Sequence, residues 1–258
     1  MKGVDFTMSR RKQQNNLSKV LILLVLILLI GVVGYFNPYI QEQLSNALNV
    51  PSNTVYTSSF DLATIPDYTD QPYVVLNDNK PDFEESVLTT ESFEKYSDLD
   101  SLGRCGYAFA NLSTDTMPKA DEERESISSV EPSGWINKKY EIVDGGYLYN
   151  RCHLIGYQLS AENANEKNLI TGTRYMNTEG MLPFENQVAD YIKETDNHVL
   201  YRVTPIYDGN NLVASGVQIE AQSVEDNGKG ICFNVYCYNV QPGIDIDYST
   251  GESKEAEN

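Results

Sequence analysis

One stretch of the chain decides how the sequence is interpreted: Tyr147-Leu-Tyr-Asn-Arg-Cys-His-Leu-Ile-Gly-Tyr157. On an extended chain, Arg151 and His153 point to one face. Asn150 and Cys152 then point to the opposite face. A guanidinium and an imidazole on one face are suited to hold a phosphate and to activate a water molecule beside it. A surface pair of side chains with satisfied hydrogen bonds is the structural alternative at this point.

A second polar group follows downstream, within Asn168-Leu-Ile-Thr-Gly-Thr-Arg-Tyr-Met-Asn-Thr-Glu-Gly-Met-Leu-Pro-Phe-Glu-Asn-Gln-Val-Ala-Asp-Tyr-Ile192. Apolar residues at helical spacing predict a helix from about Phe184. Asn177 and Glu185 are about two turns apart if the helix reaches both, although a glycine and a proline between them leave its start open. A neutral amide oxygen with water molecules suits Mg²⁺, and a nearby carboxylate can hold one of those waters. An asparagine that only caps the helix is the alternative.

The two stretches together resemble the DNA/RNA non-specific endonuclease family, which has Asp-Arg-Gly-His, then Asn, then Glu. The segments Pro132-Ser-Gly-Trp-Ile-Asn-Lys-Lys-Tyr140 and Asp144-Gly-Gly-Tyr-Leu-Tyr149 resemble the membrane-anchored, DNA-entry type of this family. The resemblance extends over about residues 72–245. It implies an α+β fold, in which a central antiparallel sheet with helices contains a ββα-metal nuclease motif.

The resemblance also implies a role for each matching residue. His153 is expected to be the general base that deprotonates the attacking water, and Arg151 is expected to bind and stabilise the phosphate. Asn177 is the expected ligand of the metal, which is Mg²⁺ with Mn²⁺ as a substitute. Glu185 is expected to hold a metal-bound water.

Two residues depart from the family's motif. Asn150 replaces the aspartate and removes a negative charge, and Cys152 replaces the glycine. Because both residues are expected to face away from His153, activity should survive, whereas the family's geometry at Cys152 stays open. A zinc site or a nucleophilic thiol at Cys152 is the alternative, but the sequence offers no third ligand for it.

The overall charge restricts the function further. The chain has 258 residues with 37 Asp+Glu and 19 Lys+Arg, a formal net charge of −18. An acidic surface repels polyanions, which excludes a protein that coats nucleic acid in general. Only residues 134–180 are balanced in charge, and Lys138, Lys139 and Arg174 there are expected to contact nucleic acid. A solvated lysine pair is the alternative for the first two.

The ends of the chain predict a location at the cell membrane. Residues 20–36 form an uncharged apolar run, and the basic residues before it place residues 1–19 in the cytoplasm by the positive-inside rule. We therefore expect a single-pass signal anchor at 20–36, with a cleaved signal peptide as the alternative. An extracellular tether over 37–71, the extracellular nuclease domain over 72–245 and an acidic disordered tail over 246–258 complete the expected order.

Local patterns predict further elements. Caps and spacing favour a helix over 90–102, and the acidic run 121–125 is expected to be a solvated loop. His198 opens an apolar segment and is expected to be structural. Expected strands cover 104–111, a hairpin pair at 198–207 and 212–220, and 231–240. Cys232 and Cys237 should face opposite sides of the last strand.

The expected function is therefore a membrane-anchored, extracellular, Mg²⁺-dependent endonuclease without sequence preference. DNA is the expected substrate, with RNA as a second candidate, and the sequence leaves protein partners open. Two alternatives stay open: a surface module that binds nucleic acid without turnover, and a phosphodiesterase that acts on a wall polymer.

Overall fold

The computed structural model describes residues 62–257. The expected cytoplasmic segment 1–19, the expected anchor 20–36 and the first part of the expected tether lie outside these residues. Between residues 62 and 257, no helix has the length and apolar character that crossing a bilayer requires.

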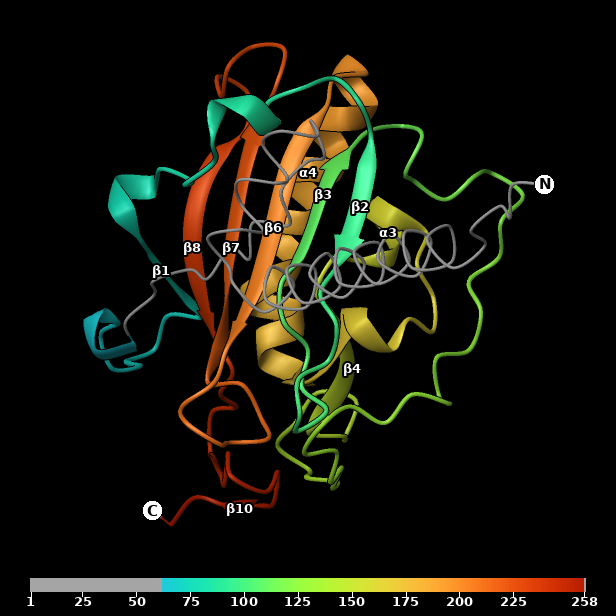
Figure 1. Cartoon of the computed structure of the whole chain (residues 1–258). Coiled ribbons are helices and arrows are strands. Elements are labelled where there is room, and N and C mark those ends of the chain that lie inside the picture. Colours follow the sequence, from blue (N-terminus) through green and yellow to red (C-terminus); the bar gives the residue numbers. More distant parts are fainter. Residues whose placement is uncertain (1–61, 258) are drawn as a thin grey trace, which may run out of the picture. The chain divides into compact units, whose positions relative to one another are not determined.

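A six-stranded antiparallel sheet forms the centre of the described part, with strand order β1-β8-β7-β6-β3-β2 (Figure 1). Two further pairs, β4–β5 and β9–β10, are separate antiparallel ribbons. The strands are β1 (Tyr73–Val75), β2 (Phe93–Tyr96), β3 (Ala108–Leu112), β4 (Tyr149–His153), β5 (Leu169–Thr173), β6 (Val199–Ile206), β7 (Gly216–Ser223), β8 (Cys232–Tyr238), β9 (Ile244–Ile246) and β10 (Ser253–Glu255). The expected α+β fold with a central antiparallel sheet is confirmed.

One long helix, α4 (Leu182–Thr195), accompanies the sheet. Pro183 lies in its first turn, directly after the π-helical turn that leads into the helix. The chain leaves the helix at Asp196, which has the left-handed conformation of a helix C-cap. The other helical elements are short: η1 (Leu62–Thr64), η2 (Asn77–Asn79), η3 (Glu85–Val87), α3 (Tyr157–Ser160), η4 (Glu166–Asn168) and the π-helical turn η5 (Met176–Met181).

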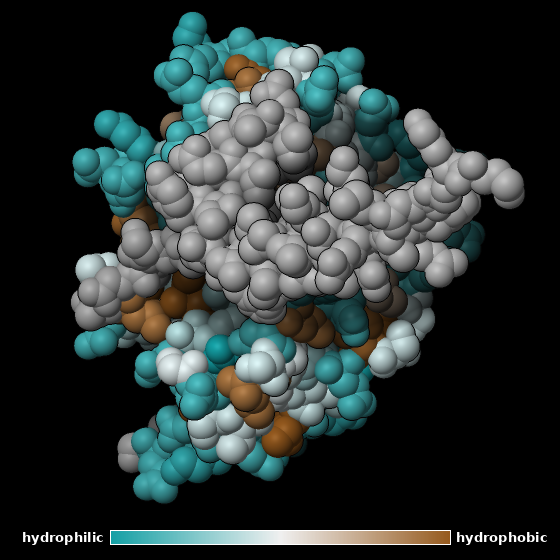
Figure 2. All heavy atoms as spheres, in the orientation of Figure 1, coloured by the Kyte–Doolittle hydropathy of each residue, from teal (hydrophilic) through white to brown (hydrophobic). Residues whose placement is uncertain are grey.

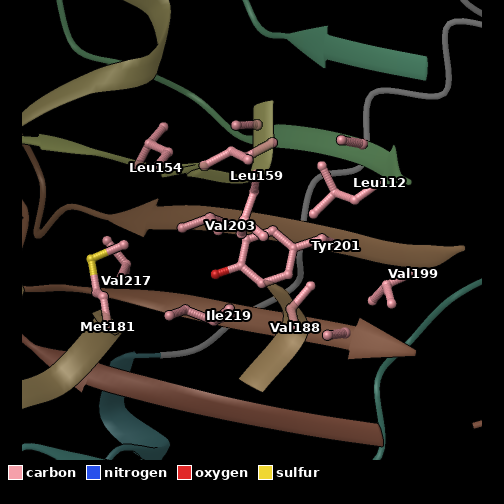
Figure 3. Close-up of a cluster of buried hydrophobic side chains, with 14 of the residues drawn as sticks. Leu112, Leu154, Leu159, Met181, Val188, Val199, Tyr201, Val203, Val217 and Ile219 are labelled. Carbon is pink, nitrogen blue, oxygen red and sulfur yellow. The ribbon is translucent and has the colours of Figure 1, made fainter. Parts of the chain in front are cut away.

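The main core lies between α4 and one face of the sheet. Alternate residues of β6, namely Val199, Tyr201 and Val203, are completely buried on this face, and Val188 of α4 packs among them (Figure 3). Each fully buried aliphatic side chain of this kind contributes about 1.5–3 kcal/mol. Around the edges of the view in Figure 2, hydrophilic residues predominate on the described surface, in agreement with the acidic composition.

The antiparallel pairing of the two strands predicted around residues 208–211 is confirmed. The first expected strand, 198–207, matches β6, whereas the second, 212–220, is only partly right, since β7 begins at Gly216. The expected strand over 231–240 is β8, in which Cys232 is exposed and Cys237 is buried. Their odd separation along this strand places them on opposite faces, as predicted. The expected strand over 104–111 is only partly right, since β3 begins at Ala108.

The helix expected over 90–102 is wrong, because Phe93–Tyr96 form the edge strand β2 instead. Phe93 packs edge-on against Phe109 of the neighbouring strand, with ring centroids 5.1 Å apart. Tyr96 donates a hydrogen bond to Glu94 two residues away, a contact that suits the period of a strand. Tertiary pairing has therefore overruled a local pattern that also fits a helix.

The acidic end expected to be disordered over 246–258 is folded in its described part, as the ribbon β9–β10. The Asp247 carboxylate accepts hydrogen bonds from the residues of the turn. Gly251 has φ +90°, and a Cβ there would lie 1.9 Å from the carbonyl oxygen of Gly134. The Tyr149 hydroxyl donates to the Gly251 carbonyl at 3.1 Å. Composition hides these specific contacts, which explains the wrong prediction.

Candidate active site

The motif strand β4 is held at both ends by asparagine side chains. Asn137 exchanges two hydrogen bonds with the backbone of Tyr149, both 2.9 Å long. Asn168 does the same with the backbone of Ile155, at 2.9 and 3.0 Å. Among the described strands, β4 pairs with β5 alone, so the two asparagines hold it in place as neighbouring strands would in a large sheet.

His153 ends β4 with its imidazole buried. Burial lowers the pKa of His153 below its usual value, so the ring is neutral at pH 7. Its Nε2 lies 3.1 Å from the carbonyl oxygen of Asn163. Because a carbonyl only accepts, Nε2 carries the proton and Nδ1 carries the lone pair of a base.

Asn177 lies in the π-helical turn η5, which runs without interruption into α4. The backbone N–H of Leu182 donates to the carbonyl of Asn177, five residues earlier. Such turns are rare and occur preferentially at functional sites. The expected two-turn relation of Asn177 and Glu185 thus holds, although the first turn is wider than that of an α-helix.

Glu185 lies in the first turn of α4 with its carboxyl group buried. Burial raises the pKa of Glu185 to about 7, against the opposing effects of the Arg124 charge and a hydrogen bond from Gln158. The chain passes very close to this carboxyl group at Gly156, where an added Cβ would lie 2.7–2.9 Å from three carboxyl atoms. Only glycine therefore fits at position 156 while Glu185 keeps this position.

One cavity of about 910 Å³ gathers the four residues expected to act together. His153, Arg151, Asn177 and Glu185 all line it. The rest of its lining is aromatic, amide, basic and apolar: Arg124, Ile127, Trp135, Asn137, Tyr147, Tyr149, Asn150, Gly156, Tyr157, Gln158, Arg174 and Leu182.

Arg151 lies on the wall of this cavity with its guanidinium over the Trp135 ring, 4.4 Å from the centroid. Its Nε donates to the carbonyl of Val130, and Nη2 donates to the carbonyl of Ser128 at 3.0 Å. These contacts fix the group and leave Nη1 without a hydrogen bond to the described residues. Arg151 is thus oriented by the protein and keeps donors for an anion.

The three other basic residues expected at the site differ in position. Arg174 lines the cavity and pairs with Asp144 at 2.9 Å. Lys139 lies with Nζ 4.6 Å from the ring centre of Tyr147, a lining residue. Lys138 is not among the lining residues; its Nζ pairs with Glu252 at 2.5 Å and donates to the Ser253 carbonyl at 2.9 Å.

Asn150 and Cys152 alternate with Arg151 and His153 along β4, in line with the expectation that they face away from His153, yet both border the site. Asn150 is a lining residue of the cavity, and the Cys152 thiol donates to Oδ1 of Asn177 at 3.0 Å. The reason is that β4–β5 is a narrow ribbon packed against η5, as the contact of Cys152 Sγ with Sδ of Met181 at 3.4 Å shows. Both faces of β4 therefore border the site.

Sequence reasoning missed Arg124 and Gln158, which line the cavity and both affect the Glu185 carboxyl group. Arg124 belongs to the acidic run 121–125, whose composition indicates only a solvated loop. Gln158 lies in the short helix α3, and nothing in its local pattern distinguishes it from a surface residue. Neither residue gives a signal in a single sequence.

The donor set at this end of the cavity fits a hydrated hard cation. The amide oxygen of Asn177 and the carboxylate of Glu185 are oxygen ligands of the kind that Mg²⁺ prefers. Within residues 62–257, no group of three or more His, Cys, Asp or Glu side chains is placed to hold a metal ion. The site therefore suits an ion that keeps most of its water, and it lacks the ligands of a structural zinc centre.

The chain is similar to several known proteins. Residues 84–225 match the model of the DNA/RNA non-specific endonuclease family. A deoxyribonuclease from Streptococcus dysgalactiae subsp. equisimilis is 26% identical over 195 residues, which are 60% of this chain and 59% of that protein. The chain thus spans about 59% of the length of this curated relative.

Two solved structures share the fold. NucA from Streptococcus agalactiae with a magnesium ion bound has a TM-score of 0.63 and 25% identity, covering 75% of this chain and 91% of its own. Sda1 nuclease with a bound zinc ion has a TM-score of 0.63 and 27% identity, covering 73% of this chain and 97% of its own.

Proposed function

The chain belongs to the DNA/RNA non-specific endonuclease family, and from this premise we propose that it hydrolyses phosphodiester bonds within DNA without sequence preference. RNA is the second candidate substrate. Mg²⁺ is the proposed cation, with Mn²⁺ as a substitute. The magnesium ion in NucA and the zinc ion in Sda1 are compatible with a divalent cation at this fold.

The observation that carries the proposal is the meeting of four side chains in one cavity. His153 and Arg151 come from β4, whereas Asn177 comes from η5 and Glu185 from α4. Residues from three elements converge on a space of about 910 Å³, which is large enough for a nucleotide segment. A general base, an anion-binding guanidinium and two oxygen ligands are what phosphodiester hydrolysis requires.

In the proposed mechanism, His153 accepts a proton from the attacking water through Nδ1. Burial keeps the imidazole in the neutral form that can accept it, and a positioned base contributes about 10²–10⁴-fold to the rate. Arg151 donates hydrogen bonds to the phosphate and stabilises its growing charge. Asn177 and Glu185 would hold the divalent cation and its water, and the cation supplies charge stabilisation worth several kcal/mol.

Low sequence specificity follows from the kinds of side chain at the cavity. Guanidinium and ammonium groups contact phosphates, and phosphate contacts carry no sequence information. We therefore expect cleavage at many sites along the substrate.

We further propose that the nuclease domain acts outside the cell, anchored by one membrane span. The support is the sequence alone: the apolar run 20–36, the basic residues before it and the polar segment after it. Protease treatment of intact cells tests the topology, since an outward domain is digested whereas a cytoplasmic one is protected.

The activity is tested with the full chain, plasmid DNA and Mg²⁺. We expect nicked, then linear and then fragmented plasmid, and EDTA should abolish this cleavage. His153→Ala should lose at least about 100-fold in rate while it still binds DNA. His198→Ala is the matched control, because the only other histidine pairs with Glu225 and is not among the lining residues. Intact plasmid at high protein concentration would overturn the proposal and favour a binding module.

A further inference from the structure

Cys152 has a contact that the proposed mechanism does not use. It replaces the glycine of the family's motif, lies between Arg151 and His153 on β4, and has no exposed surface. Its thiol donates to Oδ1 of Asn177, the proposed cation ligand, at 3.0 Å. The other possible hydrogen-bond acceptors of this thiol are farther from Sγ, with Sδ of Met181 at 3.4 Å and the carbonyl oxygen of His153 at 3.8 Å.

The neighbouring strand leaves room for this thiol at one glycine. Gly172 of β5 lies diagonally across the ribbon from Cys152, whose direct partner is Ile170. A Cβ at Gly172 would lie 2.6 Å from Cβ of Cys152 and 3.2 Å from its Sγ. Glycine weakens a strand interior, so its presence here indicates that close packing around the thiol requires it. The thiol is thus held in one place, against Asn177.

A side-chain amide needs a hydrogen-bond partner such as this thiol to keep its oxygen pointing in one direction. The oxygen and the NH₂ group of an asparagine have nearly the same shape, and only hydrogen bonds distinguish them. The oxygen has two lone pairs, so it can accept the thiol hydrogen with one and keep the other for a cation. The backbone of Asn177 is already fixed within η5, so the orientation of the amide is the freedom that remains.

We infer that Cys152 is a positioning residue, whose thiol keeps the amide oxygen of Asn177 directed into the cavity as a cation ligand. The inference rests on the proposed function, because it assumes that Asn177 binds the cation. Partners that orient the ligands of a metal commonly matter for its affinity. Cys152 is not among the lining residues of the cavity, so its effect should appear in cation affinity.

The test measures two quantities: the dissociation constant for Mn²⁺, by calorimetry on the full chain without nucleic acid, and the Mg²⁺ concentration that gives half-maximal plasmid cleavage. Cys152→Ala removes the donor. The dissociation constant and the half-maximal Mg²⁺ concentration should then both rise by about threefold to tenfold, as expected for one lost hydrogen bond. Cys152→Ser keeps a donor and should recover at least half of the lost affinity on a logarithmic scale. The maximal rate at saturating Mg²⁺ should stay within about twofold for both variants.

Cys105→Ala is the matched control, since this thiol is also buried and donates to two backbone carbonyls at 3.2 Å, those of Glu166 and Leu169. We expect Cys105→Ala and Cys152→Ala both to lower the melting temperature, but only Cys152→Ala to change the cation affinity. Unchanged affinity in Cys152→Ala, no recovery in Cys152→Ser, or an equal shift in Cys105→Ala would each overturn the inference. A wild-type chain that binds no Mn²⁺ would instead overturn the proposed function itself.

Discussion

Glu185 is a carboxyl group in a place that disfavours its charge. It is buried in the first turn of α4, and burial raises its pKa to about 7. The proposed role needs the charged form, which the Arg124 charge and the Gln158 hydrogen bond favour only in part. We infer that the fold keeps a destabilising group here because a cation would compensate for the cost when it binds.

This cost predicts that Glu185→Gln stabilises the cation-free protein. The ordinary pKa of the group is 4.5, so between pH 4.5 and about 7 the folded chain keeps a proton that the unfolded chain releases. The free energy of unfolding therefore falls as the pH rises through this window and stays low above it. Glutamine has the same shape but does not ionise. At pH 8, the free energy of unfolding of Glu185→Gln should therefore be about 1–3 kcal/mol higher than that of the wild type.

Urea unfolding in EDTA at pH 8 and pH 5 measures the effect. The difference between variant and wild type should shrink to less than about 1 kcal/mol at pH 5, since both side chains are then mostly neutral in the folded state. The same variant should lose nuclease activity at every pH. A variant no more stable than the wild type at pH 8 would show that the carboxyl group is not desolvated in the folded chain.

Single residues of the site were predictable where a motif fixes their type and spacing. His153, Arg151, Asn177 and Glu185 follow from such a motif, and the structure brings all four to one cavity. Arg124 was not predictable, because its place depends on how a long loop without regular structure crosses the cavity. Such a path is decided by tertiary contacts, which leave no period in the sequence.

The elements of the site depend on asparagines that replace missing strand partners. Besides the clamps on β4, Asn239 connects β5 to the large sheet. Its Oδ1 accepts from the Thr173 N–H at 2.8 Å. Its Nδ2 donates to the carbonyls of Thr171 and Ala214, at 3.0 and 2.9 Å. Asn239 is completely buried, so no water can replace it in these three bonds.

Asn239→Ala should therefore lower the free energy of unfolding by about 2–4 kcal/mol, because three buried backbone groups lose their partner. Chemical denaturation at pH 7 measures the loss. Asn197→Ala is the control: its amide makes one hydrogen bond near the surface, to the Tyr191 hydroxyl, and should cost less than about 1 kcal/mol. Equal losses in both variants would contradict the role given to Asn239.

Among the secondary-structure elements, the sequence predicted the long strands better than the short ones. The hairpin of β6 and β7 was predictable, because turn residues stand between two alternating segments. The edge strand β2 and the ribbon β9–β10 were not, because both are short and owe their conformation to a partner strand. Short segments have too few residues for a period to be decisive.

At the scale of the whole molecule, the charge of the chain opposes its proposed substrate. The net charge is −18, whereas the cavity has Arg124, Arg151 and Arg174 in its lining and Lys139 beside it. Association with DNA must then depend on a few local phosphate contacts against a repulsive background. Salt weakens the local attraction by counterion competition, and it also screens the repulsion.

Because only a few phosphate contacts are expected, kcat/KM should depend moderately on salt, and individual arginines should determine how strongly. With three or four phosphate contacts, the logarithm of kcat/KM should fall with the logarithm of NaCl concentration with a slope of about −2 to −4 at saturating Mg²⁺. Arg174→Ala should weaken cleavage of all sequences alike and reduce the slope by about one. Lys254→Ala removes the same charge from β10, outside the cavity lining, and should leave the slope unchanged. Equal salt slopes for Arg174→Ala and Lys254→Ala would mean that DNA responds to the net charge of the molecule and not to a local groove. The arginines of the cavity would then have no part in binding the substrate.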